Sequence, residues 1–212
     1  VLYTLMDQRK KALEMVDLTG EKLQEFPALV MLKADLLSQM GQFNAALKTL
    51  DLIDENLDRT FGIQDDVSTD LNHSPLLFHY DFSYKEYLFR RGQLLRASGI
   101  PKEAQEILEK AAQKKPKDLK IQNALMGAAI AALDHEKALE IAENANPLGS
   151  GSADLDLNQL DLVCAKLEIL LSQSEKDQVE IILQHPSLRK RDYPRLLAVK
   201  SRHAAISGRI PE

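Results

Sequence analysis

The sequence has one cysteine and no tryptophan in 212 residues. A single cysteine, Cys164, cannot form an internal disulfide, so the fold has to be held together by packing. This absence fits a reducing compartment, and the cytoplasm is the location we expect. Cys164 itself lies in an apolar stretch with helical spacing, which predicts a core position.

Excess positive charge and long apolar runs are also missing. The chain has 27 basic and 32 acidic side chains and a net charge of -5, whereas a general nucleic-acid binder needs a basic surface. No apolar run approaches the roughly 18 residues that span a membrane, so we expect no direct membrane insertion. The chain begins at Val1 without a methionine and stops at Glu212 inside a helix-start pattern, which suggests a piece of a longer protein.

The side-chain groupings that support catalysis or metal binding are not visible either. No nucleophile stands at a recognisable spacing from a base, and the five histidines show no paired ligand spacing. His73 and His79, near Asp70 and Asp81, are the best metal candidates, but loop histidines without a ligand role are far commoner. The sequence therefore predicts no enzyme activity, no cofactor and no metal site.

What the sequence does contain is an internal repeat. Ala12 and Ala46 are 34 residues apart, and so are Ala104 and Ala138. Apolar residues at helical spacing on both sides of each turn predict a pair of antiparallel helices per repeat. Gly92 is expected to face Ala104 where the two helices cross, because small residues allow close approach.

Glycine and proline mark the ends of the predicted helices. Gly41 and Gly99 are expected to end the first helix of their pairs in the left-handed conformation. Pro101 follows at the first turn of a second helix. In two later repeats the turn position holds Leu133 and Ser174 instead of glycine.

These features resemble the tetratricopeptide repeat, a 34-residue helix pair with small, bulky, alanine and proline positions at fixed spacing. The match is best over 84–117, through Gly92, Leu95, Ala104, Leu108, Ala111 and Pro116. The resemblance implies an all-α fold, a right-handed superhelix (α-solenoid) of helix pairs with one long insertion. The expected division is a half repeat 1–25, repeat 27–57, insertion 58–83, repeat 84–117, repeat 118–147, linker 148–153, repeat 154–186 and half repeat 191–212.

The insertion is where the period breaks, because Ala46 and Ala104 are 58 residues apart instead of 34. Its last part alternates aromatic and polar residues over 78–84, which leaves a β-strand open, although one strand has no pairing partner in a helical array. Helical spacing running back from Leu88 to Tyr84 instead predicts that the next helix begins at Tyr84.

The resemblance also implies a function. In this family the first helices line a concave groove that holds an extended peptide or a partner's helix, so we expect a protein-interaction scaffold. A clamp for a C-terminal carboxylate is not expected, because Met31 and Asp35 occupy its lysine and asparagine positions. The expected partner contacts are Phe78, Tyr80 and Phe82 of the insertion, Phe89, Gln93 and Arg96, and Lys120, Asn123 and Gly127, with Met31, Asp35 and Gln39 also facing the groove.

An alternative function and the possibility of self-association stay open at this point. A regulatory sensor domain would bind a small ligand and act on an effector domain elsewhere, and the small residues over 127–132 allow either tight packing or room for such a ligand. Exposed repeat ends also predict self-association, since one helix pair cannot bury its own apolar face.

Overall fold

The computed structural model describes residues 8–54, 83–149, 155–189 and 191–208. Every regular element in these ranges is helical, and none is a strand, which confirms the all-α prediction. Of the strand alternative over 78–84, residues 78–82 lie outside the described residues, and Tyr84 begins a helix. The chain divides into two compact units, Val1–Lys114 and Lys115–Glu212, which we call unit 1 and unit 2.

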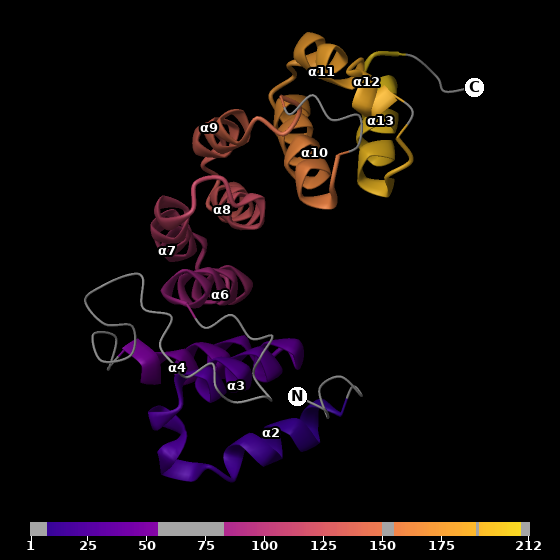
Figure 1. Ribbon diagram of the computed structural model, residues 1–212. Coiled ribbons are helices and arrows are strands. Elements are labelled where there is room, and N and C mark those ends of the chain that lie inside the picture. Colours follow the sequence, from indigo (N-terminus) through magenta and orange to yellow (C-terminus); the bar gives the residue numbers. More distant parts are fainter. Residues whose placement is uncertain (1–7, 55–82, 150–154, 190, 209–212) are drawn as a thin grey trace. The chain divides into compact units, whose positions relative to one another are not determined.

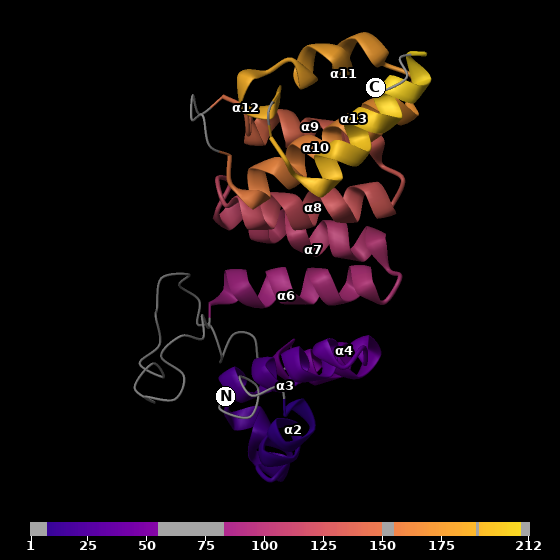
Figure 2. The same ribbon diagram turned by 90° about the vertical axis from the view of Figure 1, so that its right-hand side faces the viewer.

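Unit 1 is built from helical hairpins. Helices α3 and α4 pack together, as do α6 and α7, while α4 also contacts α6 and α2 contacts α3. Figure 2 shows α6 and α7 alongside each other, joined by a short turn. The elements are α2 (Arg9–Asp17), the 3-10 helix η1 (Gly20–Glu25), α3 (Pro27–Gln39), α4 (Phe43–Asp54), α6 (Tyr84–Ala97) and α7 (Pro101–Lys114).

Unit 2 is organised around one long helix, α10. This helix contacts α8, α9, α11 and α13 (Figure 1), and its apolar side chains form the centre of the unit's core. The elements are α8 (Leu119–Ala131), α9 (His135–Ala145), α10 (Leu157–Ser172), α11 (Lys176–Leu183), α12 (Pro186–Arg189) and α13 (Pro194–Ile206).

Local signals set the helix boundaries. Helix α6 begins at Tyr84, as predicted, and the Ser83 hydroxyl accepts a hydrogen bond from the Glu86 backbone N–H at 3.2 Å. Helix α7 begins at Pro101, also as predicted. Within the expected half repeat 1–25, α2 ends at Asp17 and the 3-10 helix η1 follows, so this part does not form one continuous helix.

The four turn positions share one backbone conformation. Gly41 and Gly99 have φ of +74° and +80°, which confirms the predicted left-handed caps. Leu133 and Ser174, with φ of +63° and +65°, adopt nearly the same conformation despite their side chains. The turn geometry is therefore kept even where the glycine is not.

The helix crossings are tight, but not in the way the sequence suggested. A β-carbon at Gly92 would lie within 3.1 Å of Cγ, Cδ1 and Cδ2 of Leu108, so the side chain nearest to Gly92 is Leu108 and not the expected Ala104. In α8, Ala128 and Ala129 are fully buried, which favours tight packing over ligand room in this alanine-rich helix.

Candidate recognition surface

The expected partner contacts have different environments. Gln93, Arg96 and Lys120 are exposed, while Asn123 and Gly127 are half-buried. Phe89 is only 3% exposed, so its side chain belongs to the core, and the expectation that it faces a partner is corrected. The remaining three expected contacts, Phe78, Tyr80 and Phe82, lie outside the described residues.

In unit 1, the Asp35 carboxylate forms an ion pair, and its side chain is only partly exposed to solvent. It pairs with Arg90 of α6, whose Nε also lies 3.0 Å from Glu86 Oε1. Burial lowers the pKa of the Arg90 guanidinium to about 10, which still leaves it charged at neutral pH. The two carboxylates offset the cost of burying this charge and connect α3 to α6.

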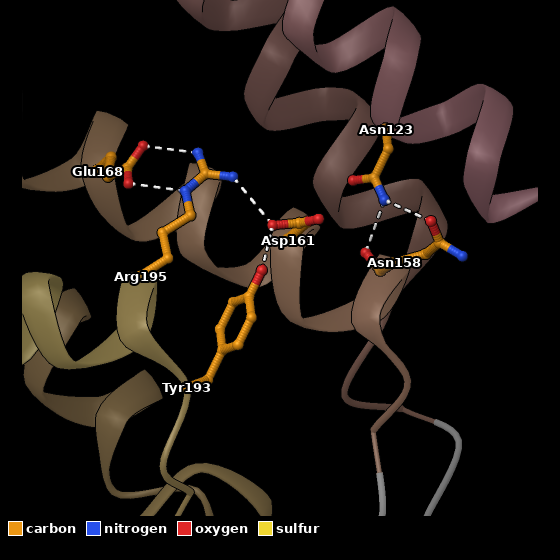
Figure 3. A network of polar contacts seen from close by, with 6 residues as sticks. All are labelled: Asn123, Asn158, Asp161, Glu168, Tyr193 and Arg195. Carbon is orange, nitrogen blue, oxygen red and sulfur yellow. Dashed lines mark hydrogen bonds and ion pairs between the residues drawn. The ribbon is translucent and has the colours of Figure 1, made fainter. Parts of the chain in front are cut away.

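A second polar network joins α10 to α13 in unit 2 (Figure 3). The Arg195 guanidinium donates from Nε to Glu168 Oε1 at 2.9 Å and from Nη2 to Oε2 at 2.8 Å. Its Nη1 lies 3.3 Å from Asp161 Oδ1, which also accepts a 2.8 Å hydrogen bond from the Tyr193 hydroxyl. Two parallel bonds between guanidinium and carboxylate fix both groups in orientation.

The electrostatics agree with this geometry. The hydrogen bond to Glu168 raises the pKa of Arg195 above its ordinary value, and the hydrogen bond to Asp161 raises the pKa of Tyr193. Beside them, burial raises the pKa of the Cys164 thiol to about 11. All three groups therefore stay protonated at neutral pH, and Cys164 is buried as the sequence predicted.

An amide pair joins α8 to α10. Asn123 Nδ2 donates to the main-chain oxygen of Asn158 at 2.8 Å and lies 3.4 Å from its side-chain Oδ1. Because α8 contacts α10 and α10 contacts α13, the two networks lie on one series of neighbouring helices. We call Asn123, Asn158, Asp161, Glu168, Tyr193 and Arg195 the polar seam.

Sequence reasoning identified only one residue of the polar seam, Asn123. The others were missed because the stretch around Cys164 was interpreted as apolar core, and because no sequence signal places Tyr193 and Arg195 beside α10. A usable signal was nevertheless present, since Asn158, Asp161 and Glu168 recur at a spacing of three and seven residues, which places them on one helix face.

Two further findings concern the described ranges only. No group of three or more His, Cys, Asp and Glu side chains there could hold a metal ion. Likewise, no helix within those ranges is both long and apolar enough to cross a membrane. The histidines at 73 and 79 fall outside them.

No family model and no curated protein matches this sequence. Solved structures do match: the "MamA RS-1 ArsTM double mutant" aligns with a TM-score of 0.59 and 14% identity over 91% of this chain and 85% of that one. A thermophilic TPR protein of Thermus thermophilus, TTC0263, aligns with a TM-score of 0.53 and 17% identity over 88% and 84%. The chain has a tetratricopeptide-like fold.

The tetratricopeptide-like fold gives each helix a place in the repeat. Consecutive helices pack in pairs, α3 with α4, α6 with α7, α8 with α9 and α10 with α11, and we call α3, α6, α8 and α10 the first helices of these pairs. Helix α13 packs on α10 and α11. The ion pair between Asp35 and Arg90 joins α3 to α6. The polar seam joins α8 to α10 and α10 to α13. In both units, polar side chains of these helices hold one another in position.

Proposed function

We propose that this chain is a non-enzymatic protein-interaction scaffold that binds an extended peptide or a partner's helix on its first helices. The observation that supports it is the polar seam, whose charged side chains are 37–40% exposed and are held by neighbouring helices. Polar groups that are already ordered lose little entropy when they bind, so a preformed surface of this kind favours recognition.

The expected contacts fall into three groups. In unit 1 they are the exposed Gln93 and Arg96 of α6, the helix that also carries the buried Phe89. In unit 2 they are Lys120, Asn123 and Gly127 of α8, to which we add the other residues of the polar seam. Phe78, Tyr80 and Phe82 form the third group, because aromatic side chains supply much of the binding energy in protein interfaces.

The test compares substitutions on first and second helices. One variant combines Arg96→Glu with Asn123→Arg, on α6 and α8. The matched control combines Lys110→Glu with Gln113→Arg, both exposed on the second helix α7, and has the same change in net charge. Proteins captured from a cell lysate by the immobilised chain are identified by mass spectrometry. We expect partners that the wild type and the control retain and that the first-helix variant loses by at least about tenfold.

Equal capture by all three proteins would contradict the proposal, provided that each variant keeps the wild-type circular dichroism and melting temperature. A third variant replaces Phe78, Tyr80 and Phe82 by serine. It should fold normally and capture less partner, whereas unfolding would mean that these aromatics belong to the core.

A further inference from the structure

One carboxylate oxygen of Asp161 accepts two hydrogen bonds, and the other accepts none from the described residues. The Tyr193 hydroxyl at 2.8 Å and Arg195 Nη1 at 3.3 Å both meet Oδ1. Among the described residues, no hydrogen bond or ion pair reaches Oδ2, and the side chain is 40% exposed. Both donors hold the carboxylate through Oδ1 alone.

Arg195 cannot turn to neutralise this second oxygen. Its Nε and Nη2 are bound to Glu168 at 2.9 Å and 2.8 Å, and the guanidinium is planar, so only Nη1 is left for Asp161. Two carboxylates share one guanidinium, so the group formed by Asp161, Glu168 and Arg195 carries one net negative charge.

Asn123 adds a second open acceptor. Its Nδ2 faces two oxygen atoms of Asn158, at 2.8 Å and 3.4 Å. The reversed amide would place Oδ1 against those same oxygens, so hydrogen-bond chemistry dictates that Oδ1 points the other way. Figure 3 shows this Oδ1 and the outer oxygen of Asp161 pointing toward one another from α8 and α10.

Two acceptors that point toward each other, one of them charged, can both accept from a single group that carries several donors. We propose that this part of the polar seam binds a basic side chain, arginine or lysine, of the segment that the scaffold recognises. The inference rests on the proposed function and specifies its partner chemistry. A guanidinium or ammonium group donates several N–H bonds and neutralises the remaining charge, whereas a carboxylate is repelled.

The test uses blocked tripeptides, so that only the central side chain differs. The whole chain, labelled with 15N, is titrated with Ac-Gly-Arg-Gly-NH2, Ac-Gly-Lys-Gly-NH2 and Ac-Gly-Glu-Gly-NH2. The observed signals are the side-chain amides of Asn123 and Asn158 and the backbone amide of Asp161. We expect saturable shifts with the two basic peptides, with dissociation constants on the order of millimolar for so small a contact, and no saturable shift with the glutamate peptide.

Asp161→Asn is the main variant. Its side-chain oxygen can still accept from Tyr193 and Arg195, while an NH2 group replaces the open oxygen. Binding of the basic peptides should weaken at least tenfold. The control Glu140→Gln makes the same charge change at an exposed position of α9 and should leave binding unchanged.

Lys120 allows the sign of the proposed charge interaction to be tested, because its positive charge lies on α8 three positions before Asn123. Lys120→Met removes a positive charge, so the basic peptides should bind more tightly. Weaker binding would contradict the proposed charge interaction. If Asp161→Asn alters the amide spectrum beyond α10 and α13, this second variant decides the question.

An equal response to the glutamate peptide, or wild-type binding by a folded Asp161→Asn, would overturn the inference. If protein capture depends on the first helices but the basic peptides cause no shifts, the scaffold function stands and this inference fails. If the peptides bind but capture is the same for all variants, the proposed function fails and the basic-residue site stands.

Discussion

Leu133 and Ser174 adopt a backbone conformation that favours glycine. For other residues it costs about 1–2 kcal/mol, because Cβ approaches the following carbonyl oxygen. At Leu133 the turn is held by hydrogen bonds from its own N–H to Ile130 O at 3.0 Å and from Asp134 N–H to Ala129 O at 2.9 Å. The strain is thus maintained by the helix ends on either side.

Leu133→Gly should stabilise the chain by up to about 1 kcal/mol. The substitution releases the strain of the positive φ, and the greater freedom of unfolded glycine, about 0.5–1 kcal/mol, offsets part of the gain. The leucine side chain is 81% exposed, so little packing is lost. Urea denaturation measures the change.

The control for this prediction is Leu133→Ala, which keeps the β-carbon and with it the strain. It should leave the free energy of unfolding nearly unchanged. If alanine stabilises as much as glycine, the gain comes from removing an exposed apolar side chain and the strain argument is wrong.

At the scale of the helical elements, the contact between Gly92 and Leu108 sets how closely α6 and α7 approach. Both residues are buried, and a β-carbon on Gly92 has no room beside the leucine. Helix propensity favours alanine over glycine by about 1 kcal/mol. Steric overlap in a packed core opposes it with about 1–3 kcal/mol.

Gly92→Ala should therefore destabilise the chain by up to about 2 kcal/mol, the difference between those two effects. In a Leu108→Ala background the steric term disappears, and the same substitution should become neutral or stabilising. Thermal or urea unfolding of the four proteins in this double-mutant cycle measures the coupling. Identical effects of Gly92→Ala in the two backgrounds would show that Leu108 is not its partner.

The helix pairs were predictable from sequence because their signals are local. The serine cap before Tyr84 and the proline at 101 lie within one turn of the boundaries that they set. The neighbour of Gly92 was predicted one helical turn away, as Ala104 instead of Leu108, because it depends on how far α6 and α7 are offset along their axes. Periodicity does not fix that offset to within one turn.

The polar seam shows a second limit. Asp161 and Arg195 are 34 residues apart in sequence and meet only because α10 packs on α13. Sequence spacing within one helix could have marked Asp161 and Glu168 as a polar face. Which cation meets them could not be known before the helices were in place.

At the scale of the whole molecule, the apolar core of unit 2 is centred on α10. Eight of its side chains are at most 4% exposed on several sides of the helix, and the clustered ones pack with residues of α11, α12 and α13. Repeat proteins are stabilised by contacts between neighbouring elements, so damage to one element should act mainly on its neighbours.

Leu167→Ala should lower the stability of unit 2 by about 2–5 kcal/mol, because this fully buried side chain leaves a cavity in the core. Hydrogen exchange should accelerate most in α10, α11 and α13 and least in α3 and α4. The control Ile181→Ala, at a side chain that is 71% exposed, should change little. Uniform acceleration over the whole chain would contradict this prediction.

The enclosure of α10 by four other helices also has an evolutionary consequence. Most substitutions on such a helix disturb a packed contact or a charged network, so few of its positions can change neutrally. Among homologues, the apolar positions of α10 should diverge more slowly than exposed ones such as Ile181 and Leu197. Where Asp161 does change, a compensating change at Arg195 or Tyr193 should accompany it.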